Sequence, residues 1–266
     1  MTDPRDRFSE ALNQLSLSGR IVFVHSSWSE MAPLANSPLQ LLDTLCQAVG
    51  EKGTVVMPTY PLRGLSDTYL ASNRRFDWRR TPSQVGLLTE LFRRMPGTRR
   101  SLHPTHSVAA RGAKATELTR GHELCPTPFD ENSPFHRMFE GDALVLNLGV
   151  QTVSFRHLAD HMLQDSLDHD VYSSRRVQVL LVDEQGRELW METRGHNPEI
   201  TCNHRLALGR LREGGGTRLV AVGPSQLELI PVRAYMETYH RCYREGELRF
   251  SARGAEELRQ LNEGGL

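Results

Sequence analysis

The chain has 266 residues, enough to bury a large core, and its 32 Lys and Arg residues balance 32 Asp and Glu residues. The hydrophobic fraction of 38% and the charged fraction of 24% are ordinary for a water-soluble globular protein. Balanced charge excludes a global positive field that would recruit nucleic acid or an anionic membrane, so we expect neither as a partner.

The first half of the chain alternates helix and strand patterns. Apolar runs rich in β-branched residues predict buried strands, and capped amphipathic runs predict helices. In chain order these are a helix over 3–15, a strand over 20–25, a helix over 38–49, a strand over 54–60, a helix over 84–95 and strands over 107–110 and 142–150. Residues 61–80 are polar and irregular, and loops of that length are often functional.

The second half begins with a helix over 157–165. Strands over 176–183 and 187–193, separated by Gln185-Gly186, predict a β-hairpin. Further strands are expected over 217–222 and 227–232, with helices over 203–212 and 232–245. This order predicts an α/β fold with a mixed sheet flanked by helices, in one domain over residues 1–266.

The N-terminal residues, MTDPRDRFSEAL, lack the apolar core of a signal peptide, and no apolar run approaches the roughly 20 residues that span a bilayer. We therefore expect a cytoplasmic protein. The four cysteines form no CxxC motif and are expected to be reduced.

Polar side chains follow three of the predicted strands. His25, Ser26 and Ser27 end the first, Thr59 and Tyr60 end the second, and residues 151–154 follow the strand over 142–150. Because ligands of α/β sheets bind beyond the carboxyl ends of the strands, these groups predict a polar rim around a cleft.

The helix over 157–165 places His157, Asp160 and His161 on one face. Such a face is often merely solvated, but an imidazole beside a carboxylate is also suited to general base catalysis. The same spacing permits a zinc hydrolase that uses His157 and His161, with Glu192, His196, Cys202 or His204 as further ligands. Glu192 itself either orients the imidazole or forms a cross-strand pair with an arginine.

The stretch RRSLHPTHSVAARG, residues 99–112, joins a helix to a strand. Arg100 and Ser101 are suited to binding a phosphate, and no GxGxxG or P-loop motif supports another nucleotide site. We expect His103 and His106 in this stretch to be structural or to support the site indirectly.

Several motifs together resemble the aminoglycoside 3-N-acetyltransferase family, the antibiotic N-acetyltransferases. They are VHSS at 24–27, GTVVMPT at 53–59, RSLHPTHSVAARG at 100–112, SP at 133–134, LNLGV at 146–150 and HLAD at 157–160. The resemblance implies that family's own α/β fold, distinct from the commoner GNAT fold. It also implies acetyl-CoA as co-substrate, no metal, and direct transfer of the acetyl group to a small-molecule amine.

The resemblance also implies roles for individual residues. His157 matches the general base, Glu192 matches the carboxylate that orients it, and Asp160 completes the expected catalytic set. The expected coenzyme-binding residues are His25, Ser26, Ser27, Arg100, Ser101, Ser107 and Val108. Backbone N–H groups at the start of the helix that carries His157, from residue 154 on, are expected to stabilise the oxyanion.

The chain departs from the family pattern around the base. The family's Thr-Leu-His-Leu-Ala-Glu is Phe-Arg-His-Leu-Ala-Asp at residues 155–160. We expect four arginines to crowd the acceptor side, namely Arg156, Arg175, Arg176 and Arg194. Because guanidinium groups repel a polycation, we expect an amino sugar or antibiotic-pathway intermediate with an anionic group, rather than a resistance-type aminoglycoside. A catalytically impaired binding module is a further alternative, and the protein is expected to be a monomer or homodimer.

Overall fold

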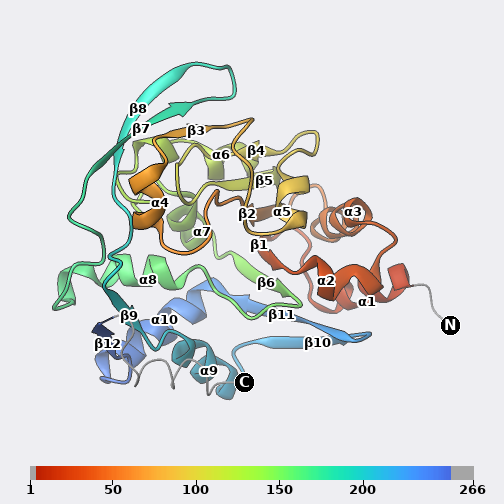
Figure 1. Ribbon diagram of the computed structural model, residues 1–266. Coiled ribbons are helices and arrows are strands. Elements are labelled where there is room, and N and C mark those ends of the chain that lie inside the picture. The colour runs from red at the N-terminus through yellow and green to blue at the C-terminus, as the bar shows by residue number, and fades with distance from the viewer. Residues whose placement is uncertain (1–3, 253–266) are drawn as a thin grey trace.

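The computed structural model describes residues 4–252 (Figure 1). Its main sheet has seven strands in the order β10-β11-β6-β1-β2-β5-β4. The bounds of these strands are β1 Ile21–Ser26, β2 Thr54–Pro58, β4 Arg99–Arg100, β5 Val108–Gly112, β6 Leu144–Leu148, β10 Arg218–Val222 and β11 Ser225–Pro231. The central strands β6, β1 and β2 are parallel, and their outer neighbours are antiparallel to them, so the sheet is mixed as expected.

Helices cover both faces of this sheet (Figure 1). One face packs against α1 Pro4–Gln14, α2 Trp28–Met31, α3 Pro38–Val49 and α5 Leu87–Phe92. The other packs against α6 Ala115–Thr119, α7 Pro134–Glu140, α8 Arg156–Leu163, α9 Arg205–Glu213 and α10 Val232–Arg244.

Alternation along the strands divides the core in two. In β1, Phe23 belongs to the cluster under α7 and α8, whereas Val22 and Val24 belong to the cluster under α3 and α5. All three side chains are fully buried. The continuous apolar run of β1 thus reflects a strand that is covered on both faces.

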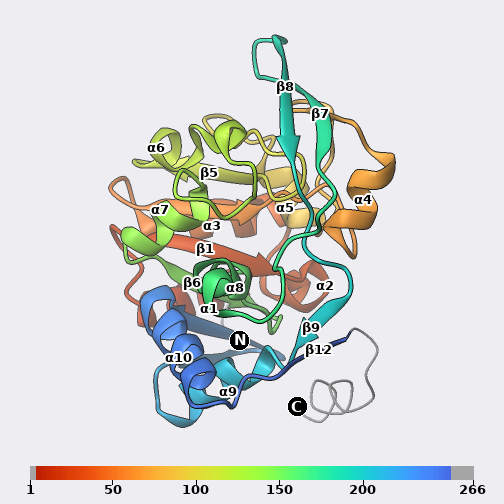
Figure 2. The ribbon, with the colours of Figure 1, turned by 90° about the vertical axis from the view of Figure 1, so that its left-hand side faces the viewer.

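The predicted hairpin is confirmed, but it lies outside the main sheet. Its strands, β7 Val177–Val182 and β8 Glu188–Thr193, pair with β3 Arg75–Asp77 to form a separate three-stranded sheet. This hairpin projects from the body of the molecule (Figures 1 and 2). A third, two-stranded sheet pairs β9 Ile200–Cys202 with β12 Phe250–Ala252.

Two predictions for the region before β4 were wrong in detail. Residues 61–80 contain α4 Ser66–Ser72 and β3, where we expected irregular chain. The helix expected over 84–95 is only α5, because Gly86 lies at a φ of 130°, which a helix does not accommodate. Within residues 4–252, no helix is both long and apolar enough to cross a membrane.

Candidate active site

The carboxyl ends of β6, β1 and β2 meet at one edge of the sheet, as the parallel pairing requires. Helix α8 follows β6 from this edge, and its side chains line a cavity of about 330 Å³. The cavity is lined by residues before and at the start of α4, in α8, before and within β9, and in β12. Its polar lining residues include Ser66, His106, Arg156, His157, Asp160, Asp170, His196 and His204.

Three imidazoles meet at the cavity wall. The ring centre of His157 lies 4.4 Å from that of His196 and 6.1 Å from that of His106, and His106 and His196 are 5.3 Å apart. Phe129 stacks on His157 with a centroid distance of 5.7 Å. The ring of His196 is oriented by Ser66, whose Oγ lies 3.2 Å from Nδ1. His157 is therefore held among other rings, with one edge still open to the cavity.

Burial keeps these imidazoles neutral. Desolvation lowers the pKa of His157 well below its usual value, and the positive charge of Arg156 lowers it further. Burial also lowers the pKa of His106 to about 3. A neutral imidazole at a cavity wall is able to accept a proton near pH 7.

Asp160 lies on the same helix face, one turn beyond His157. Its carboxylate accepts a hydrogen bond of 2.5 Å from the hydroxyl of Tyr239 in α10. Burial raises the pKa of Asp160 to about 6. Asp160 therefore supplies a carboxylate whose charge changes close to neutral pH.

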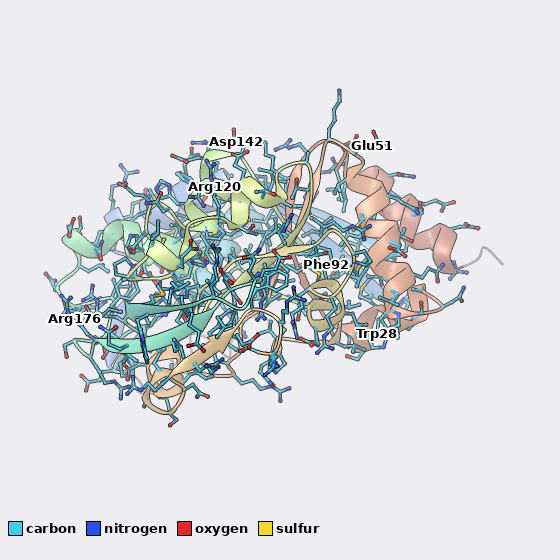
Figure 3. The ribbon with its side chains drawn as sticks, turned by 90° about the horizontal axis from the view of Figure 1, so that it is seen from above. Trp28, Glu51, Phe92, Arg120, Asp142 and Arg176 are labelled. Atoms are coloured by element: carbon cyan, nitrogen blue, oxygen red, sulfur yellow. The ribbon has the colours of Figure 1, made fainter. Side chains whose placement is uncertain are left out.

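Glu192 does not orient His157 in this structure, so that expectation was wrong. Along β8, Met191 and Thr193 are buried, and the alternation turns Glu192 to the exposed face. Its carboxylate accepts hydrogen bonds from Arg176 at 2.8 Å and Gln178 at 3.2 Å. Arg176 lies at the periphery of the molecule (Figure 3). The cross-strand arginine pair is the alternative that the structure shows.

Arg100, which we expect to bind coenzyme phosphates, donates mainly to the protein in this structure. Its side chain is buried, and it lies over the ring of Phe76. Its guanidinium donates to the carbonyl oxygens of Thr59, Trp78 and Thr81 and to the hydroxyl of Thr59. With four of its five N–H donors occupied by protein, Arg100 ties the segment over 75–81 to the sheet.

The neighbouring residues of the same stretch are also occupied within the protein. The hydroxyl of Ser101 binds Nδ1 of His122 at 2.9 Å and accepts the backbone N–H of Val108. The hydroxyl of Ser107 donates to the carbonyl of Thr59. All three residues are fully buried, and the coenzyme contacts expected of Ser101, Ser107 and Val108 stay a prediction.

The end of β1 is different, because it carries a polar atom without a partner. Among the described residues, the hydroxyl of Ser26 is buried and makes no hydrogen bond, and the buried hydroxyl of Tyr60 is near Ser154 alone. Ser27 pairs with the hydroxyl of Ser29, and His25 accepts the backbone N–H of Ser154 at 3.4 Å. Buried polar groups normally have partners, so Ser26 and Tyr60 are suited to contact a bound molecule.

At α8, the backbone N–H groups of Arg156 and His157 donate to the carbonyls of Val153 and Ser154 in the preceding turn, so these two are not free for an oxyanion. For the zinc alternative, Nδ1 of His161 lies 2.9 Å from the hydroxyl of Tyr172. Between residues 4 and 252, no group of three or more His, Cys, Asp or Glu side chains is arranged to hold a metal ion.

His106 and His196 are the site residues that sequence reasoning missed. We expected His106 to be structural or indirect, and considered His196 only as a zinc ligand, yet both line the cavity beside His157. His106 lies within the motif over 100–112, whereas for His196 the available signal was its residue type alone.

The structural role of Arg100 leads to a testable prediction. Arg100→Leu keeps the apolar contact with Phe76 but leaves buried carbonyls without donors, which costs roughly 1–3 kcal/mol. We expect urea denaturation to show this loss while the affinity for coenzyme A, measured by calorimetry, stays within a few-fold of wild type. A weakened coenzyme affinity in a variant of normal stability would contradict the assignment.

Comparisons with known proteins agree with the motifs. A family model described as aminoglycoside 3-N-acetyltransferase matches residues 23–243. Aminoglycoside N(3)-acetyltransferase IV from Salmonella sp is 34% identical over 157 residues, a match that spans 58% of this chain but only 56% of that relative's length. Aminoglycoside N(3)-acetyltransferase III from Salmonella sp is 32% identical over 239 residues. That match spans 77% of this chain and 81% of that relative's length.

The fold agrees with a solved structure as well. AAC-IIIb, in a binary complex with CoASH, superposes with a TM-score of 0.75 over 91% of this chain and 96% of that chain, at 22% identity. The mixed sheet and the helices that cover it are therefore those of that fold. The chain belongs to the aminoglycoside 3-N-acetyltransferase family, a family of acyltransferases.

Proposed function

We propose that this protein transfers an acetyl group from acetyl-CoA directly to the amine of an aminoglycoside-like or amino-sugar acceptor. His157 is the general base. The observation that carries the proposal is the neutral imidazole of His157 on the wall of a ligand-sized cavity, in a chain of this acetyltransferase family.

The chemistry requires a base at this position. An ammonium group has no lone pair and cannot attack a thioester, so a proton must leave the nitrogen as it bonds to the acyl carbon. Because burial holds the pKa of His157 well below its usual value, the imidazole is unprotonated when the acceptor arrives. His106 and His196 hold the ring in place and, being neutral themselves, do not repel the proton that His157 receives.

Asp160 supports the same reaction from one turn away. Its carboxylate lines the cavity and is charged above a pKa of about 6, so it attracts an ammonium group of the acceptor. Tyr239 fixes one carboxylate oxygen and leaves the charge in place. We assign Asp160 to acceptor binding beside the base.

The residues at the end of β1 and β2 fit an acetyl-CoA arm. The pantetheine arm of coenzyme A carries amide groups, and the buried hydroxyl of Ser26 lacks a partner among residues 4–252, with Tyr60 just beyond the end of the neighbouring strand β2. These two residues are our candidates for donor binding. Acetyl-CoA supplies the activated acyl group, and the CoASH bound to AAC-IIIb supports this choice of donor.

A thiol-release assay tests this function. Purified protein with acetyl-CoA is supplied with a panel of amino sugars and aminoglycosides, with and without a metal chelator. We expect thiol release that depends on the amine and is unaffected by the chelator. Release that proceeds equally without any amine, or that chelation abolishes, would favour a hydrolase instead.

A further inference from the structure

Of the four arginines expected on the acceptor side, only Arg156 lines the cavity. Arg175 forms an ion pair of 2.5 Å with Asp67, and Arg176 pairs with Glu192 at 2.8 Å. Arg194 lies over the ring of Tyr172, 5.5 Å from its centre. Arg156 is therefore the arginine whose position bears on what the cavity accepts.

Arg156 has no partner in the described part of the chain. Its guanidinium makes no hydrogen bond or ion pair there, although the side chain is only partly exposed. Asp160, four residues along the same helix, binds the hydroxyl of Tyr239 and forms no ion pair with Arg156, although the charge of Arg156 acts to lower the pKa of Asp160. The other three arginines expected near the acceptor each form an ion pair or lie over an aromatic ring, and Arg156 does neither.

The position of Arg156 also works against local stability. It is the first residue of α8, where the partial positive charge of the helix end disfavours a cation. The same cation lowers the pKa of the cavity imidazoles His157, His196 and His204, so its charge acts on the whole cavity. An unpaired guanidinium in such a place offers a planar set of donors for a carboxylate or phosphate.

We propose that Arg156 binds an anionic group of the acceptor, so that the preferred acceptor is an amine that also carries a carboxylate or phosphate. This inference rests on the proposed function and narrows its substrate. Asp160 attracts the ammonium while Arg156 binds the anion, and both lie on one face of α8 beside His157. Asp170, at the same cavity, is the further carboxylate that an additional ammonium group would meet.

The anion that Arg156 binds belongs to the acceptor and not to the coenzyme, because the phosphates of the coenzyme lie far from its thioester. The attacking nitrogen must approach the acyl carbon to about 3–3.5 Å beside the base. Arg156 adjoins that base in the chain and shares its cavity, whereas the pantetheine arm separates the coenzyme phosphates from the thioester. The phosphates are thus kept away from the place that Arg156 occupies.

The test compares glucosamine with glucosamine 6-phosphate, two amines that differ in one anionic group. Wild type, Arg156→Gln and Arg156→Lys are assayed, with Arg176→Gln as a control that removes the same charge from the exposed hairpin. Binding of each amine and of coenzyme A is measured by calorimetry in the absence of turnover. We expect wild type and Arg176→Gln to bind the phosphorylated amine at least about tenfold more tightly, and Arg156→Gln to lose that preference.

Each outcome has a distinct meaning. Loss of the preference with unchanged coenzyme affinity, and partial retention in Arg156→Lys, support the inference. Equal binding of the two amines by wild type, or a coenzyme affinity that falls with Arg156→Gln while the preference stays, overturns it. If the preference is found in binding but no acetylated amine forms, the anion site stands and the proposed function fails.

Discussion

Replacing His157 with Ala is expected to lower turnover by a factor of roughly 10² to 10⁴ while coenzyme A still binds. The variant removes the only imidazole that α8 presents to the cavity among its lining residues, and an amine nitrogen then has no base to take its proton. His106 and His196 each use Nδ1 for a neighbouring hydroxyl, of Thr105 and Ser66 respectively, and we expect them to hold the ring of His157 rather than replace it as base. Steady-state kinetics with acetyl-CoA, and calorimetry with coenzyme A, measure the two effects separately.

A matched control separates loss of the base from loss of a histidine. His136 lies on α7, does not line the cavity, and has Glu140 as its neighbour at 3.8 Å. His136→Ala is expected to keep turnover within a few-fold of wild type. Turnover of His157→Ala close to that of wild type would remove His157 from the role of base.

Folding stability is expected to fall steeply as pH decreases below 6.5. Burial lowers the pKa of His25, His106 and His122 to about 3 in the folded protein. Below pH 6.5 the unfolded chain binds protons on these residues and the folded protein does not, so acid favours unfolding. Each histidine contributes about 1.4 kcal/mol per pH unit between its folded and unfolded pKa.

Together the buried histidines are expected to weaken folding by several kcal/mol between pH 6.5 and 4.5, with about 1.4 kcal/mol per pH unit for each group. Asp160 opposes this change, because its folded pKa of about 6 lies above the usual value and the folded protein binds its proton first. A single opposing carboxyl group does not offset the histidines, so a net loss of stability remains.

Urea denaturation at pH 8, 7, 6 and 5 measures this dependence. We expect little change between pH 8 and 7, where all these histidines are neutral in both states, and a progressive drop in the midpoint from 6 to 5. A midpoint that is constant from pH 7 to 5 would show that these histidines titrate normally in the folded protein.

Periodicity predicted the sheet well because its central strands have an unusual environment. Strands such as β1 and β6 are buried on both faces, so their sequences are continuous apolar runs that only a covered parallel strand accommodates. The parallel pairing places the polar residues at their ends on one edge of the sheet, but the cavity beside α8 is lined by other residues.

Roles that depend on where a side chain's donors point were not predictable in the same way. Arg100 looked like a phosphate ligand because its type is right, but the carbonyls that occupy it come from Trp78 and Thr81, in a segment expected to be irregular. For Glu192, the sequence did not settle which face of the strand carries the side chain, since a shift of one residue in the alternation turns it to the opposite face. His196 reaches His157 from beyond the hairpin, a contact that no local pattern encodes.

The central claim is that one cavity takes a thioester and an amine and transfers the acyl group between them without forming an acyl-enzyme. Mass spectrometry of a single reaction measures the released coenzyme A, the acetylated amine and the intact protein together. The account predicts one acetylated amine for each coenzyme A released, and an unmodified protein when the amine is omitted. Coenzyme A released without acetylated amine, or a protein that carries the acetyl group and passes it on when the amine is added, would contradict it.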